Sequence, residues 1–155
     1  MKKSNKGFSL VELIIVIAIM AILAAAIAPA LIRYIDKSRK ADDIQFFGQF
    51  ATAANSALAN EDAYSDVTAN MGTGNAVYTV AFDQNGVLQG LPTSNEFEKE
   101  VSSTIGNGNK LKYTKGAKNC SSKNITIVIS ADEKVHVSVD GKEVNPTIDT
   151  NSQWK

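Results

Sequence analysis

The chain has 155 residues, of which 44% are hydrophobic, and its formal net charge is zero, which suits one domain plus one further segment. The neutral total hides an asymmetry: residues 1–40 hold seven Lys and Arg against two acids (+5), and residues 41–155 hold nine Lys against 14 acids (−5). The acidic balance of the larger part disfavours nucleic-acid binding, because phosphates repel acidic surfaces. One histidine and one cysteine form no catalytic or metal-binding pattern, so we predict no enzyme activity, cofactor or metal site.

A basic stretch precedes a long apolar run. Lys2, Lys3 and Lys6 lie before Gly7, and the 20 positions from Leu13 to Ile32 contain no charged residue. At about 1.5 Å per residue, these positions form a helix of about 30 Å, which matches the hydrocarbon core of a bilayer. The segment is therefore predicted to span a membrane.

Glu12 lies at the start of this apolar run. An ionised side chain in hydrocarbon costs about 2 to 3 kcal/mol even on lenient scales, so a plain anchor has no use for it. An opposite charge in the same low-dielectric surroundings would offset that cost. The sequence therefore predicts a partner for this carboxylate.

Two simpler interpretations of the N-terminus remain open. A secretory signal peptide would also have a basic start and a small-residue cleavage site, here Ala26-Ile27-Ala28 or Ala28-Pro29-Ala30. Against it, the apolar run exceeds the roughly 7 to 15 residues typical of such peptides, Glu12 interrupts its beginning, and Pro29 lies at each candidate cleavage site. An uncleaved anchor leaves Glu12 unexplained.

The first 40 residues resemble the type IV pilins and pseudopilins, in which a basic leader ends in glycine and a hydrophobic helix follows. Gly7, Phe8 and Glu12 match the family pattern, and Pro29 falls where many pilins have a helix-kinking proline. The resemblance implies that residues 1–7 are a leader, removed between Gly7 and Phe8 by a prepilin peptidase, and that the Phe8 amine is then N-methylated. It also implies that Glu12 pairs with the Phe8 amine of its own or a neighbouring subunit during assembly.

The resemblance further implies partners and location. The subunit would polymerise with itself into a helical filament, with the help of an inner-membrane assembly platform and an ATPase motor. Before assembly it would be a single-pass membrane protein in contact with lipid, and afterwards part of an extracellular pilus. The apolar helix 8–32 would then be the assembly segment, and 33–155 the globular domain.

The helical pattern continues past the apolar run. Apolar residues at spacings near three and four, among them Phe47, Phe50, Ala54 and Leu58, predict one helix over about 8–60 whose outer half is amphipathic. Pro29 should kink it around Ala25 to Ala28. Residues 60–76 show no periodicity and are expected to be a polar connection.

Shorter elements follow. A strand is predicted at Val77–Phe82, then a turn at 83–86 and a return strand starting at Val87–Leu88. A capping box of Thr93 and Glu96 predicts a short helix. Its apolar face would carry Phe97, Val101 and Ile105.

The C-terminal third has the pattern of an antiparallel sheet. Strands are predicted at Leu111–Thr114, Ile125–Ile129, Val135–Val139 and Lys142–Val144, with a loop over Lys115–Lys123. The expected fold class is α+β, a pilin fold in which the long N-terminal helix packs on an antiparallel sheet of three or four strands.

The remaining candidate residues carry little chemistry. Cys120 is the only cysteine, so no intramolecular disulfide forms, and the resemblance then favours a Gram-positive source. His136 is expected on the strand face opposite the valines, as a surface residue. Acidic pairs such as Asp132 with Glu133 are expected to be solvated loop residues.

Three functions remain open. The first is a structural subunit of a type IV pilus, for adhesion, aggregation or surface (twitching) motility. The second is a pseudopilin of a type II secretion or competence DNA-uptake system. The third is a surface-anchored binding protein that never polymerises.

Overall fold

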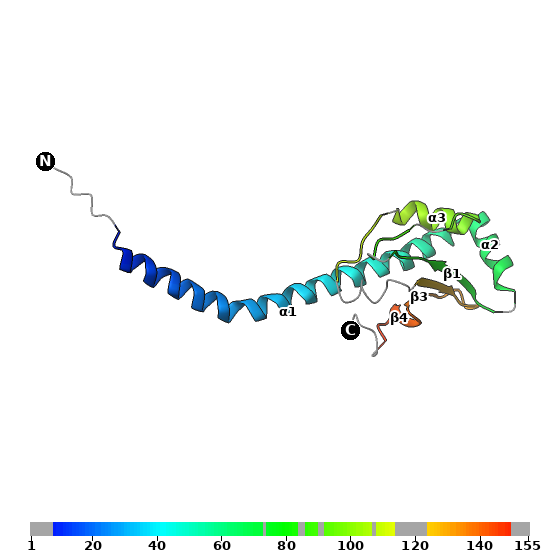
Figure 1. Ribbon diagram of the computed structural model, residues 1–155. Helices are drawn as coiled ribbons and strands as arrows, with labels where there is room; N and C mark the ends of the chain where they lie inside the picture. The colour runs from blue at the N-terminus through cyan, green and yellow to red at the C-terminus, as the bar shows by residue number, and fades with distance from the viewer. Residues whose placement is uncertain are drawn as a thin grey trace. The chain divides into compact units, whose positions relative to one another are not determined.

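The computed structural model describes residues 8–72, 74–83, 86–89, 92–106, 108–113 and 124–149. The chain divides into two compact units, Met1–Ser38 and Arg39–Lys155. Helices and strands follow in the order α1, α2, β1, α3, β2, β3 and β4 (Figure 1). This mixture of a long N-terminal helix and an antiparallel sheet confirms the predicted α+β class.

Helix α1 (Leu10–Ala57) has 48 residues and contains Pro29 without a break in the helix assignment. Alanines and leucines in its first half favour a helix and offset the lower helix propensity of the β-branched isoleucines and valines there. The blue part of the ribbon bends in Figure 1, as expected where a proline removes one backbone hydrogen bond. The predicted helix over 8–60 was therefore nearly right, with an observed end three residues earlier.

Helix α2 (Glu61–Met71) corrects the expectation of an unstructured connection over 60–76. The side chain of Asn60 accepts hydrogen bonds from the backbone N–H groups of Asp62 and Ala63, which caps the helix. Ala63 and Val67, four positions apart, are buried. Two buried positions in a polar segment gave too weak a periodicity to predict this helix.

The sheet has four antiparallel strands in the order β1-β2-β3-β4: Ala76–Val80, Ile125–Ile129, Val135–Val139 and Lys142–Asn145. Buried and less buried residues alternate along β2 and β3, as the β-branched pattern predicted. Asp140 and Gly141 both have positive φ, which a two-residue hairpin turn between β3 and β4 requires. The prediction of three to four strands is confirmed at four.

The described residues do not form two of the predicted strands, the return strand that starts at Val87–Leu88 and the strand at Leu111–Thr114. Phe82 and Leu88 form only an isolated bridge, and so do Val87 and Lys110, so the hairpin predicted after β1 does not extend into a pair of strands. Leu111 and Tyr113 are buried, but their segment is not a strand. Thr114 and the predicted loop over Lys115–Lys123 lie outside the described residues.

Helix α3 (Glu96–Ile105) confirms the predicted short helix, and Phe97, Val101 and Ile105 are buried as expected. The predicted capping box was displaced by two residues. Asn95, not Thr93, caps the helix by accepting a hydrogen bond from the backbone N–H of Glu98, 2.8 Å away. The Glu98 carboxylate in turn accepts from the backbone N–H of Ser94 at 2.8 Å.

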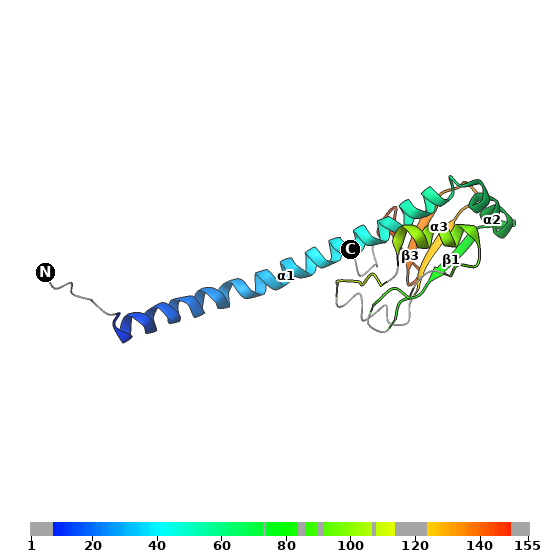
Figure 2. The same cartoon turned by 90° about the horizontal axis from the view of Figure 1, so that it is seen from above.

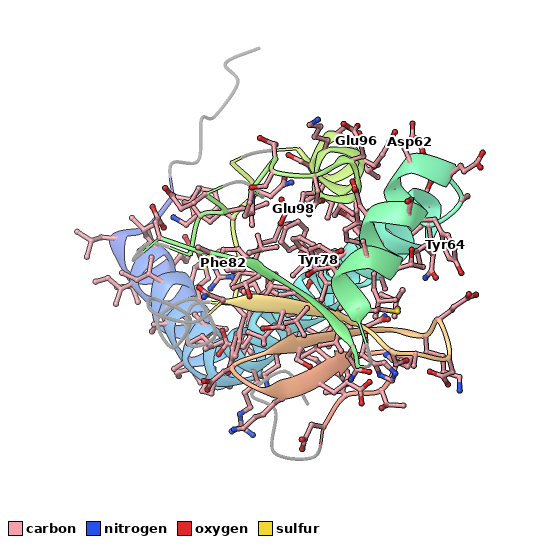
Figure 3. All side chains as sticks on the ribbon, turned by 90° about the vertical axis from the view of Figure 1, so that its right-hand side faces the viewer. Asp62, Tyr64, Tyr78, Phe82, Glu96 and Glu98 are labelled. Carbon is pink, nitrogen blue, oxygen red and sulfur yellow. The ribbon has the colours of Figure 1, made fainter. Side chains whose placement is uncertain are left out.

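The outer half of α1 supplies one wall of the hydrophobic core of the second unit. Phe47, Phe50 and Ala54 are fully buried and belong to one cluster with the inward residues of the sheet. Figure 2 shows the cyan part of α1 running alongside the strands. The ring centroids of Tyr78 on β1 and Phe97 on α3 lie 4.4 Å apart, and Figure 3 shows Tyr78 inside this unit. Burial of this apolar face explains why the sheet needs the helix.

Candidate functional site

The first half of α1 carries an exposed apolar surface. Its most apolar stretch of 18 residues has a mean hydropathy of 3.0, and none of these residues is buried. By length and composition, the helix could therefore cross a membrane. Exposed apolar surface of this extent marks a lipid or protein contact. Among the large apolar side chains of residues 8–32, the most exposed are Phe8, Leu10, Val11, Leu13, Met20, Ile22, Ile27 and Ile32.

Glu12 lies in the first turn of this helix. Its carboxylate oxygen Oε2 accepts a hydrogen bond from the backbone N–H of Ser9, 2.9 Å away. The backbone N–H of Leu13 donates to the carbonyl oxygen of Ser9 at 3.2 Å, which closes the first helical turn. Ser9 is thus the residue before α1, and Glu12 is its third helical residue, the spacing of a capping box.

This hydrogen bond supplies a local partner that sequence reasoning missed. The signal was present, because Ser9-Leu10-Val11-Glu12 has the S-x-x-E pattern of a capping box. A carboxylate in the first turn also interacts favourably with the positive end of the helix dipole. Glu12 therefore has a structural use in a helix that carries no cleaved amine, contrary to our premise that a plain anchor leaves it without a role.

Phe8 precedes α1 and has an 88% exposed side chain. Neither Phe8 nor Ser9 is part of the helix, so the chain on the carboxyl side of the predicted cleavage point is not helical. Gly7 and the other predicted leader residues lie outside the described residues. Cleavage between Gly7 and Phe8, and methylation of Phe8, stay predictions.

Asp43 is a buried carboxylate that sequence analysis did not single out, with only 2% of its surface exposed. It lies on the outer half of α1, and its two oxygens accept hydrogen bonds from the backbone N–H groups of Lys112 at 2.7 Å and Tyr113 at 3.0 Å. The ammonium group of Lys40 lies 5.1 Å from the centre of the Tyr113 ring. Asp43 therefore fixes segment 110–113 against α1.

Next to Asp43, residues of α1 and of segment 109–112 line an open pocket of about 250 Å³. Its acidic residues are engaged, since Asp43 holds the backbone of 112–113 and Asp42 forms an ion pair of 3.1 Å with Lys112. Exposed amides, among them Gln45 and Gln49, form much of the remaining wall. The residues that line this pocket include neither a histidine nor a cysteine.

His136 lies on the face of β3 opposite the buried valines, as predicted. Its Nδ1 lies 2.6 Å from Oε1 of Glu143 on β4, and Thr147 donates a hydrogen bond to the other carboxylate oxygen at 3.2 Å. Each partner's side chain is about one third exposed. The pair of His136 and Glu143 links β3 to β4 on the face of the sheet opposite the buried valines.

The turn between β2 and β3 contains an exposed acidic pair. Asp132 interacts with Lys134 and Ser130, and the hydrogen bond from Lys134 holds the pKa of its carboxyl at about 2. Glu133 accepts a hydrogen bond of 2.8 Å from the hydroxyl of Tyr64 on α2. Both acids therefore have partners within the chain.

Comparison with known proteins points to the same region. Residues 2–28 match the family model described as the prokaryotic N-terminal methylation motif. The type IV major pilin protein PilA of Myxococcus xanthus (strain DK1622) is 37% identical over 68 residues, which are 44% of this chain and 31% of that protein. The chain thus spans about a third of the length of this curated relative. No solved structure matches the present chain significantly.

The chain combines a long apolar N-terminal helix, which has a carboxylate in its first turn, with a small antiparallel sheet, as expected for a pilin fold. The chain thus carries the prokaryotic N-terminal methylation motif and is similar to a type IV major pilin over 44% of its length.

Proposed function

We propose that this protein is a structural subunit of a type IV pilus that polymerises through residues 8–32. The observation that carries the proposal is the apolar first half of α1, in which no residue of the 18-residue apolar window is buried and Glu12 lies in the first turn. An apolar surface with no cover in the monomer needs lipid before assembly and neighbouring helices afterwards. The described core cluster contains residues of the second unit only, and none from the first half of α1.

Cleavage would change the surroundings of Glu12. In the uncleaved chain the backbone N–H of Ser9 is its hydrogen-bond partner. Removal of residues 1–7 creates a cationic amine on Phe8, one residue before Ser9. In a low-dielectric helical bundle, that amine and the Glu12 carboxylate attract strongly, and either one left alone is penalised. A subunit out of register would bury an unpaired charge, so the pair acts as a register for assembly.

The proposed partners follow from this role. A prepilin peptidase cleaves after Gly7, and an inner-membrane platform with an ATPase motor moves the subunit from the bilayer into the filament. Helix association in lipid gains packing rather than hydrophobic transfer energy, so extraction from the membrane requires external work. The filament would serve adhesion, aggregation or surface motility.

Mass spectrometry of the native protein tests the proposed processing. The expected N-terminus is Phe8 carrying one methyl group. An N-terminus at Met1, or one created by cleavage near Pro29, would refute it. A Gly7→Val variant of the leader is the control, and it should retain Met1 and its leader.

Electron microscopy of material sheared from the cell surface tests polymerisation. Long filaments that contain this chain as their main component support the pilus subunit. Short fragments found only when the protein is overproduced would instead support the pseudopilin of a secretion or DNA-uptake system. Absence of filaments together with a correctly processed N-terminus would leave the non-polymerising surface protein as the better description.

A further inference from the structure

The helix turn that follows the apolar run carries two cations with no partner among the residues that the structure describes. Arg33 and Lys37 are four positions apart, so both project from one face of α1. Both are exposed, and neither makes a hydrogen bond or an ion pair with any residue that the structure describes. Asp36, the one acidic residue in this turn, forms no ion pair with them either.

Tyr34 lies beside these cations and is 72% exposed. Aromatic side chains with a polar tip are enriched at the boundary between hydrocarbon and headgroups, and long cationic side chains extend from the end of a span into the headgroup layer. A guanidinium also matches the geometry of a phosphate, because it donates two parallel hydrogen bonds. The chemistry of this turn is therefore that of a phosphate-binding membrane boundary.

The spacing to Glu12 gives this turn a second property. Arg33 lies 21 positions after Glu12 in the same helix, which corresponds to about 31 Å along its axis. The hydrocarbon core of a bilayer is about 30 Å thick. When Arg33 lies at one headgroup layer, Glu12 therefore reaches the opposite boundary instead of the centre of the membrane.

We propose that Arg33, Tyr34 and Lys37 form a binding site for the phosphate headgroups of anionic lipids, which holds the unassembled subunit at the depth where Glu12 lies at the opposite membrane boundary. The inference rests on the proposed membrane span of residues 8–32 but not on polymerisation or cleavage. Anionic lipids are favoured over zwitterionic ones, since a zwitterionic headgroup presents a cation beside its phosphate.

The test uses the full chain in vesicles of phosphatidylcholine with a minor share of spin-labelled lipid. Electron paramagnetic resonance measures how strongly the protein immobilises labelled phosphatidylglycerol relative to labelled phosphatidylcholine. The wild type should select phosphatidylglycerol, and R33Q/K37Q should lower that selectivity by as much as about 30-fold, since each cation near an anionic surface contributes about 1 kcal/mol. The leader lysines contribute equally to both proteins and cancel in the comparison.

The matched control is K99Q/K134Q, which removes the same charge from side chains that are 51% and 71% exposed on the exported domain. Its selectivity should equal that of the wild type. Equal selectivity of R33Q/K37Q and the wild type would overturn the lipid site. In that case, loss of chemical cross-links between copies of the variant would assign the two cations to contact with a second subunit.

Alkaline extraction of the same vesicles distinguishes failure of the lipid site from failure of the proposed membrane span. A protein that the extraction removes would refute the membrane span and the lipid site together, whereas a protein that stays inserted without selectivity would refute the lipid site alone.

Discussion

The backbone N–H of Ser9 donates a hydrogen bond of 2.9 Å to the carboxylate of Glu12 across the first turn of α1. The same carboxylate is the one whose partner we propose to change when the leader is removed. Two roles, a helix cap and a counter-charge, therefore depend on one side chain. They differ in what they require, because a cap needs a hydrogen-bond acceptor and a counter-charge needs an ionised group.

Two variants of Glu12 separate these roles. Glu12→Gln keeps an oxygen that accepts from Ser9 but removes the charge, and Glu12→Ala removes both. We expect both variants to insert into the membrane and both to lose filaments, because the Phe8 amine then lacks its counter-charge. Filament yield by shearing and membrane content by fractionation are the measurements. Normal filaments from Glu12→Gln would show that the cap alone is needed.

Asp43 should be important for the stability of the second unit, Arg39–Lys155. Asp43→Ala leaves the backbone N–H groups of Lys112 and Tyr113 without their acceptor, and we expect a loss of about 3 kcal/mol in the free energy of unfolding. Asp42→Ala is the matched control, since it removes only an exposed ion pair and should cost less than about 1 kcal/mol. Denaturant unfolding of the full chain in detergent gives both values, and equal losses would contradict the assigned role of Asp43.

The contact between Tyr64 and Glu133 predicts a dependence on alkaline pH. The hydrogen bond to the Glu133 carboxylate raises the pKa of Tyr64 above its ordinary value of 10.0. Its contribution to stability is therefore complete below pH 10 and is lost as the pH rises through the higher pKa of the folded state. The side chain is exposed, so the effect should be small.

Absorbance of tyrosinate against pH measures this shift directly. Tyr64→Phe should reduce the component that titrates above pH 10 by one tyrosine, while Tyr78, whose pKa is raised by burial, still contributes to it. Glu133→Gln should lower the pKa of Tyr64 toward 10. Tyr34→Phe serves as the control, because Tyr34 makes no hydrogen bond with any residue that the structure describes. A tyrosine titration that is the same in Glu133→Gln and the wild type would refute the contact.

The cap of α3 offers a fourth prediction. Asn95→Ala removes the acceptor for the backbone N–H of Glu98, and we expect a loss of about 1 kcal/mol in the free energy of unfolding. Thr93→Ala tests the position that the sequence pattern had indicated and should change it by less than about 0.5 kcal/mol. Chemical denaturation of both variants decides between the two caps, and the reverse order of effects would restore the predicted one.

Local pattern predicted most of the elements. The β-branched run Ile125–Ile129 and the alternating valines of β3 formed strands in place, and the length of α1 followed from continuous apolar periodicity. It missed α2, whose buried residues are only Ala63 and Val67, and it placed a strand at Leu111–Thr114 where the described residues 111–113 form none. The apolar residues Leu111 and Tyr113 are buried there, but the segment's backbone is held by Asp43, 70 positions earlier, and not by a neighbouring strand.

The sequence by itself determined the N-terminal region: the position of Glu12, the charge-free length after it and the cations beyond. These are properties of one continuous helix, in which spacing along the chain sets spacing in space. Tertiary structure alone decided which backbone groups Asp43 binds, which strand pairs with β1, and which acidic residue accepts the hydrogen bond from Tyr64. Each of these contacts joins residues far apart in the chain, and their geometry depends on the packing of several elements at once, which no local pattern contains.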